Sequence, residues 1–219
     1  MSPPIRPLRV AALFSGGGRT LVNLQDRIEE GSLAAEIVTT IASRPDCPGI
    51  QRAKARGLPV EVVWRHDYPE EPALHNRLDA VLIASRAELV VLCGYLRRFR
   101  VAAPSGLDWS GRVMNIHPAL LPDFGGQGMY GDRVHAAVLA AGRTVSGCTV
   151  HFVDPIYDHG PIILQRTCPV RPDDDVATLA ARVFAVECTT YPQAIQWQAE
   201  GRLRIEGGAV VVQAAFPPG

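Results

Sequence analysis

The stretch LRVAALFSGGGRT (Leu8–Thr20) joins a short, nearly all-apolar run to a glycine-rich turn. An apolar run of this length is typical of a parallel strand that is covered on both faces. The sequence LVNLQDRIEEG follows, with apolar residues at helical spacing and a glycine stop at Gly31. A strand, a tight turn and a helix in this order begin the repeating unit of an α/β sheet.

The alternation of strand and helix patterns continues through the first half of the chain, which predicts a doubly wound α/β fold with a mostly parallel open sheet. Helical patterns end near Gly57 and cover residues 71–85. Further strands are expected at residues 35–43, 60–64, 88–96 and 111–117.

The second half changes character and predicts an antiparallel addition to the sheet. The stretch Pro122–Arg133 holds four glycines and is expected to form a mobile loop. A helix should then end at Gly142, and Asp173–Asp175 should open a long helix as N-cap and dipole partner. The expected strands are residues 146–154 and 161–170, followed by a hairpin around Gly207-Gly208.

Composition narrows the class of protein. The chain has 219 residues, of which 47% are apolar, and a formal net charge of zero, so neither nucleic acid nor an anionic membrane is an expected partner. A neutral chain is more compatible with small-molecule substrates than with either of these polyanionic partners. Five dispersed cysteines and the lack of a signal-peptide or membrane-spanning pattern predict a soluble, cytoplasmic protein with reduced thiols. For the oligomeric state, a monomer and a homodimer both stay open.

The turn SGGGRT stands where an open α/β sheet places a phosphate at a helix N-terminus. Glycines let the backbone N–H groups approach an anion, and Arg19 could add a bidentate contact. The dinucleotide pattern is poor, because its third glycine would fall at Leu21 and no acidic residue ends the second strand. A monophosphate is therefore favoured, with NADP or an empty tight turn as the alternatives.

A second motif is RVMNIHPALLPDFGG, residues 112–126. In a strand, Asn115 and His117 point to the same face, and Pro118 prevents the hydrogen-bond ladder from continuing. Two polar side chains therefore project together from a strand end. They are either a pair of satisfied polar residues at a strand edge or a functional pair.

A third motif, HFVDPIYDHGP, spans residues 151–161. His151, Asp154, Asp158 and His159 could suggest a metal cluster. Their spacing matches no common ligand pattern on one element, and Asp158 and Gly160 are typical turn residues, so a metal site is disfavoured.

These motifs together resemble the folate-dependent formyltransferases. The likeness rests on N-I-H-P-A-L-L-P, followed by G-C-T-V-H-F-V and D-x-G-P, and it covers nearly the whole chain. Further matching stretches are S-G-G-G, V-V-L-C-G-Y-L-R-R-F, E-C-T-T-Y-P and G-R-L-R-I. The resemblance implies a single Rossmann-like domain over residues 1–219, with a phosphate-binding half (about 8–110) and a catalytic and folate-binding half (about 111–219).

The resemblance also implies a reaction. The motifs are most like those of members that move a formyl group from 10-formyltetrahydrofolate, as co-substrate, to the primary amine of 5'-phosphoribosylglycinamide in purine synthesis, without a metal. The implied catalytic residues are Asn115, His117 and Asp158. The implied residues for the phosphate and glycinamide are Gly17, Gly18, Arg19, Thr20 and Glu187. The implied folate-binding residues are Leu96, Arg97, Arg98, Phe99 and Asn115.

Chemistry agrees with these roles. When an amine attacks a formyl carbon, the carbonyl oxygen gains negative charge, and fixed donors stabilise that charge most in the transition state. The Asn115 amide and a protonated His117 suit this task. A nearby carboxylate favours the imidazolium, so Asp158 is expected to raise the pKa of His117 and to relay protons.

Three features depart from the family pattern and leave the amine acceptor open. Arg19-Thr20 stands where the family often has Ser-Asn, the loop after His117 is longer and richer in glycine, and Glu71 falls where some relatives use an arginine. Another small amine, such as an amino sugar, is one alternative. A non-catalytic folate-binding paralogue is the other, whereas a transfer-RNA formyltransferase would need an additional RNA-binding domain.

Overall fold

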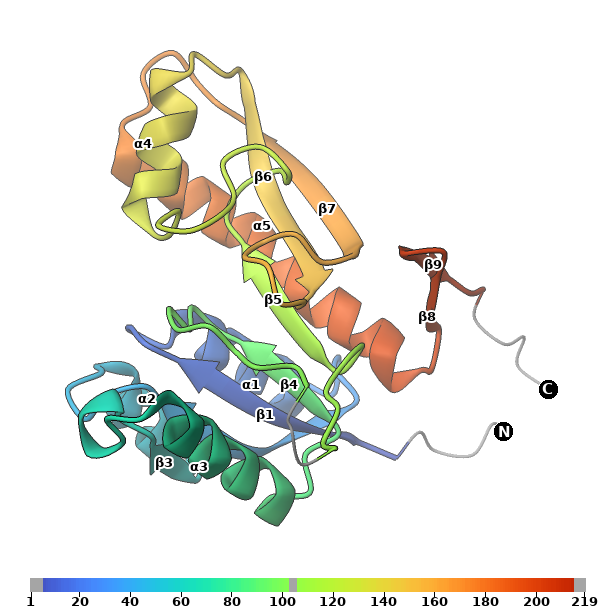
Figure 1. Ribbon diagram of the computed structural model, residues 1–219. Coiled ribbons are helices and arrows are strands. Elements are labelled where there is room, and N and C mark those ends of the chain that lie inside the picture. Colours follow the sequence, from blue (N-terminus) through green and yellow to red (C-terminus); the bar gives the residue numbers. More distant parts are fainter. Residues whose placement is uncertain (1–5, 103–105, 215–219) are drawn as a thin grey trace. The chain divides into compact units, whose positions relative to one another are not determined.

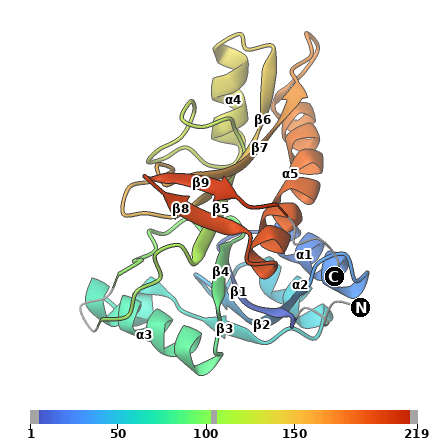
Figure 2. The ribbon, with the colours of Figure 1, turned by 90° about the vertical axis from the view of Figure 1, so that its right-hand side faces the viewer.

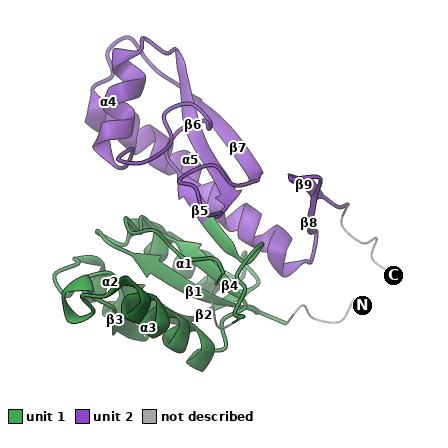
Figure 3. Cartoon of the chain, in the orientation of Figure 1, with its two compact units in different colours: residues 1–114, 218–219 green, residues 115–217 purple. Residues whose placement is uncertain are grey.

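The structure is a computed structural model that describes residues 6–102 and 106–214. Its strands pair in the order β3-β2-β1-β4-β5-β6-β7, with a separate two-stranded sheet, β8-β9 (Figure 1). The chain divides into two compact units, one ending at Met114 and the other beginning at Asn115 (Figure 3). Among the described residues, no helix is long and apolar enough to cross a membrane.

The first unit is a parallel α/β sheet. Strand β1 (Leu8–Phe14) pairs in parallel with β2 (Ala35–Ala42) and β4 (Leu89–Leu92), and β2 pairs with β3 (Val60–Val62). Residues 10–14 of β1 are all buried, as expected for a strand covered on both faces. Helices α1 (Arg19–Glu29) and α2 (Gly49–Ala55) lie on one face of this sheet, and α3 (Glu71–Ala84) lies on the other (Figure 2).

This strand order places a switch point between β1 and β4. The chain leaves β1 toward β2 and β3 on one side and returns to β4 on the other. In open α/β sheets, ligands bind at the carboxyl ends of the strands at such a point. The glycine turn follows β1 and residues 93–99 follow β4, so both predicted binding segments lie at this edge of the first unit.

The second unit begins within β5 (Val113–His117) and contains α4 (Asp132–Ala140). Strands β6 (Val145–Phe152) and β7 (Ile162–Pro169) pair in antiparallel fashion, which confirms the expected addition to the sheet. Helix α5 (Val176–Ala199) packs against both strands. The hairpin of β8 (Leu203–Glu206) and β9 (Ala209–Val212) follows it and turns at Gly207 and Gly208, as predicted.

Most predicted elements are present, but several ends differ. The expected strand 88–96 stops at Leu92, because the backbone turns at Gly94 with a φ of 73°. The long helix is N-capped by Asp175 alone: its carboxylate accepts the Thr178 N–H at 2.8 Å, whereas Asp174 pairs with Arg182. A short 3-10 turn, η1 (Arg65–Asp67), follows Trp64, which was expected to end the third strand.

Candidate active site

Strand β5 delivers the two polar residues of the second motif to the candidate site. His117 ends the strand and is 3% exposed, and Asn115 is partly exposed. Both side chains contact residues of the second unit that lie outside β5. Their partners lie in residues 118–126 after β5, in residues 153–161 between β6 and β7 and, for Asn115, also on β6.

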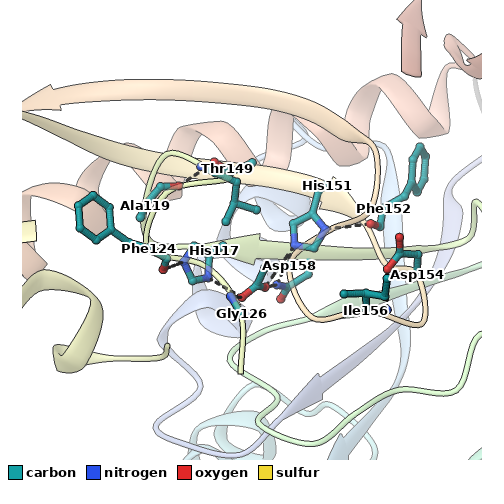
Figure 4. Close-up of polar contacts among 12 residues, drawn as sticks. His117, Ala119, Phe124, Gly126, Thr149, His151, Phe152, Asp154, Ile156 and Asp158 are labelled. Carbon is teal, nitrogen blue, oxygen red and sulfur yellow. Dashed lines mark hydrogen bonds and ion pairs between the residues drawn. The ribbon is translucent and has the colours of Figure 1, made fainter. Parts of the chain in front are cut away.

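The loop after β5 contacts the site through its main chain (Figure 4). The carbonyl oxygen of Phe124 lies 2.8 Å from Nε2 of His117, which must therefore carry a proton and donate to it. The N–H of Gly126 donates to Oδ2 of Asp158 at 3.0 Å. The main chain of residues 124–126 thus makes hydrogen bonds to both the imidazole of His117 and the carboxylate of Asp158.

Asp158 comes from the loop between β6 and β7, where it has a left-handed backbone with a φ of 53°. Its Oδ2 lies 3.4 Å from Nδ1 of His117, and its Oδ1 lies 3.4 Å from Nδ2 of Asn115. The side chain is only 11% exposed. The structure therefore brings together Asn115, His117 and Asp158, the three residues that the motifs implied.

His151 is a fourth member that sequence reasoning did not assign to this group. Its Nδ1–H donates to the carbonyl oxygen of Phe152 at 2.8 Å, and in that tautomer Nε2 is an acceptor. Nε2 accepts from Nδ2 of Asn115 at 3.1 Å and lies 3.6 Å from Oδ1 of Asp158. His151 therefore orients the amide of Asn115. The available signal was its position on β6, in the same motif as Asp158.

The disfavoured metal cluster does not assemble. Nδ1 of His159 lies 2.7 Å from Oδ2 of Asp154, and this exposed pair is separate from the contacts of His151 and Asp158. Within the described part of the chain, no three His, Cys, Asp or Glu side chains are grouped to hold a metal ion.

Burial changes the protonation of the pair. Burial is the largest influence on His117 and lowers its pKa, while Asp158 and the carbonyl of Phe124 act in the opposite direction and only partly offset it. Burial alone would raise the pKa of Asp158, but the neighbouring imidazoles of His151 and His117 and the N–H of Gly126 lower it overall.

The pKa of His117 therefore lies below its ordinary value, whereas the sequence predicted a rise caused by Asp158. Asp158 acts in the predicted direction, but the free energy of removing the imidazolium from water is larger. Both ring nitrogens nevertheless face oxygen atoms, so the site can accommodate an imidazolium once another negative charge appears beside it.

The glycine turn of the first unit has a left-handed backbone conformation that favours glycine at position 18. Gly18 has a φ of 71° and precedes α1, whose N-terminus has no side-chain cap. A Cβ on Gly18 would lie 3.0 Å from the Cα of Gly49, so only glycine fits this approach of turn and helix α2. Arg52 of α2 donates to the carbonyl of Gly17. Arg19 is exposed, and Thr20 is half-buried on α1.

The predicted folate segment contacts the same turn. Ser15 N–H donates to the carbonyl of Gly94 at 3.0 Å, and Leu96 N–H donates to Oγ of Ser15 at 2.9 Å. Within this segment Leu96 is 51% exposed and Phe99 is buried, while Arg97 is partly exposed and Arg98 is exposed. The phosphate and folate segments therefore form one edge of the first unit.

Glu187, the last implied residue, is half-buried on α5 in the second unit. The implied residues thus divide between the units: the glycine turn and residues 96–99 belong to the first, and the polar cluster and Glu187 belong to the second.

Comparison with known proteins identifies the family of the chain. The family model described as formyl transferase matches residues 8–195. Phosphoribosylglycinamide formyltransferase of Haemophilus influenzae is 32% identical over 199 residues, which cover 90% of each chain. The trifunctional purine biosynthetic protein adenosine-3 of Bos taurus is 39% identical over 92% of this chain, which spans only 19% of that relative.

The fold agrees as well. The crystal structure of glycinamide ribonucleotide transformylase 1 from Symbiobacterium toebii superposes with a TM-score of 0.88 at 37% identity and covers 95% of both chains. The match of the family model over most of the chain, the full-length relative and the shared architecture lead to one conclusion. The chain belongs to the formyl transferase family.

Proposed function

We propose that this protein transfers the formyl group of 10-formyltetrahydrofolate to the primary amine of 5'-phosphoribosylglycinamide. The observation that carries the proposal is the cluster of an amide, a buried imidazole and an ionised carboxylate formed by Asn115, His117 and Asp158. Binding alone would need no such pair of an imidazole and a carboxylate. The names of the full-length relatives support this amine as the acceptor.

Asn115 is the proposed donor to the oxygen that becomes negative. One of its amide N–H groups is held by Nε2 of His151 at 3.1 Å. The other is 3.4 Å from Asp158, a long contact that can be exchanged for a stronger one to the substrate oxygen. A donor fixed in this way is typically worth about 3–4 kcal/mol in the transition state.

His117 and Asp158 are the proposed proton carriers. In the free protein, burial lowers the pKa of the His117 imidazole, and the pKa of Asp158 also lies below its ordinary value. As the amine attacks, the growing charge on the oxygen and the charge of Asp158 together favour the imidazolium. The pair can then accept the amine proton and return it, through water, to the leaving nitrogen of the folate.

The remaining implied residues are proposed to bind the two substrates. In this proposal the turn from Gly17 to Thr20 holds the phosphate, Glu187 holds the glycinamide end, and residues 96–99 hold the folate. The first half of the domain, about 8–110, would then bind phosphate, and the second, about 111–219, would carry catalysis. The reaction uses the folate as co-substrate, in the cytoplasm, and needs no metal.

A formyl-transfer assay with a panel of amines tests the proposal. Wild-type protein should formylate 5'-phosphoribosylglycinamide with a kcat/KM at least tenfold above that for glycinamide or an amino-sugar phosphate. A higher kcat/KM for an amino sugar would identify that sugar as the acceptor, and the proposed role of the site in formyl transfer would stand. Binding of the folate without transfer to any amine would instead identify a non-catalytic folate-binding protein.

A further inference from the structure

Thr149, a buried residue of β6, lies at the centre of a hydrogen-bond network that the reaction itself does not use (Figure 4). Its hydroxyl donates to the carbonyl of Ala119 at 2.7 Å and accepts from the N–H of Leu121 at 3.0 Å. It also accepts from Nε2 of Gln165 at 2.9 Å. One donor and two acceptor positions are thus all occupied, which is the full capacity of a hydroxyl.

Gln165, on β7, completes the attachment. Its Nε2 lies 2.9 Å from the carbonyl oxygen of Leu121 and donates to it. Leu121 is therefore held at both its N–H and its carbonyl by side chains of β6 and β7. These bonds fix the beginning of the loop that follows His117.

The same loop reaches the proton-carrying pair only a few residues later. A Cβ on Gly125 would lie 2.5 Å from Cδ2 of Leu121 and 3.2 Å from Cβ of Asp158, so Leu121 and Asp158 both pack closely against Gly125. The Phe124 carbonyl accepts from His117, and the neighbouring N–H of Gly126 donates to Asp158. A shift of Leu121 would therefore move partners of both residues.

We infer that Thr149 is a positioning residue of the proposed active site: through residues 119–126 its hydroxyl sets the geometry of His117 relative to Asp158. Thr149 contacts none of the reacting groups. The inference rests on the proposed function for its kinetic consequence, although its geometric consequence at His117 can be measured without any reaction.

A matched control separates positioning from simple stability. Thr40, on β2 in the other unit, is also buried, and its hydroxyl donates to the carbonyl of Pro59 at 2.8 Å. Thr40→Val removes the same hydroxyl from a similar environment but contacts no part of the loop 119–126. Thr149→Ser keeps the hydroxyl. Gln165→Met removes one donor from an exposed residue and leaves the buried hydroxyl in place, so it carries less risk to folding.

The experiment measures kcat, both KM values and the ¹⁵N resonances of the His117 ring in these variants. Thr149→Val should lower kcat at least tenfold with both KM values within twofold of wild type. Gln165→Met should lower kcat about threefold, and Thr149→Ser and Thr40→Val should stay within twofold of wild type. The His117 resonances should shift in Thr149→Val, more than in Thr40→Val.

Equal losses of kcat in Thr149→Val and Thr40→Val, or His117 resonances that do not move in Thr149→Val, would overturn the inference. If Thr149→Val does not fold, the kcat and the His117 ring resonances of Gln165→Met test the inference instead. If the wild-type protein transfers no formyl group, the proposed function fails on its own, and the ring resonances still decide the role of Thr149.

Discussion

Replacing Asp158 by asparagine tests the proton-carrying pair. The substitution keeps the shape of the side chain, and one oxygen can still accept the Gly126 N–H. What is lost is the negative charge 3.4 Å from Nδ1 of His117. At an effective dielectric constant of about 20, a charge pair at that separation is worth about 5 kcal/mol.

Part of this loss of interaction energy is offset, because an uncharged amide costs less free energy to bury than a carboxylate does. We therefore expect Asp158→Asn to lower kcat about 10³-fold, which corresponds to about 4 kcal/mol. The assay follows folate product formation at saturating concentrations of both substrates, and circular dichroism checks that the variant is folded. A variant that keeps more than a tenth of the wild-type kcat would refute the reasoning.

Three further predictions concern protonation and packing. In the free protein the His117 ring should titrate below the ordinary value of about 6.5, and further below it in Asp158→Asn, because Asp158 raises the pKa that burial lowers; ¹⁵N NMR would contradict this with a value above 6.5. Burial also lowers the pKa values of His75 and His135 in the folded protein. Below about pH 6.5 the unfolded chain therefore binds more protons than the folded chain. The free energy of unfolding should consequently fall as the pH drops from 7 toward 5. Urea unfolding at several pH values measures this, and a free energy that stays level or rises would argue against it. Gly160→Ala should destabilise the protein by more than about 3 kcal/mol in the same assay, since the new Cβ would lie 1.9 Å from the Phe152 carbonyl oxygen. Gly16→Ala should change stability little, because the space around Gly16 is open. Similar losses of stability in the two variants would contradict this prediction.

The parts of the fold that sequence predicted are those with a strong local pattern. The apolar run of β1, the glycine turn and the spacing of α1 lie next to one another in the chain, and each has its own signal. The same holds for Asn115 and His117, because a strand's period of two places both on one face. The apolar pattern also continued past Leu92, however, where the backbone turns at Gly94 and the strand ends.

The parts that sequence could not predict depend on main-chain positions and burial. The carbonyl of Phe124 and the N–H of Gly126 hold His117 and Asp158, the proposed catalytic pair, but every residue has these groups, so no residue type marks them. The lowered pKa of His117 follows from its burial in the folded chain, which a list of charged neighbours does not reveal. His151 was considered only as a metal ligand, because its partner Asn115 lies 36 residues away.

The central claim is that the cluster around Asn115 moves a formyl group directly from folate to an amine. Following ¹³C-labelled formyl from 10-formyltetrahydrofolate by NMR, with 5'-phosphoribosylglycinamide present, tests it most directly. The wild-type protein should convert the label to a formamide on the amine, and Asn115→Ala should slow this conversion at least a hundredfold. Label that appears as free formate, or a formamide produced at the wild-type rate by Asn115→Ala, would contradict the account.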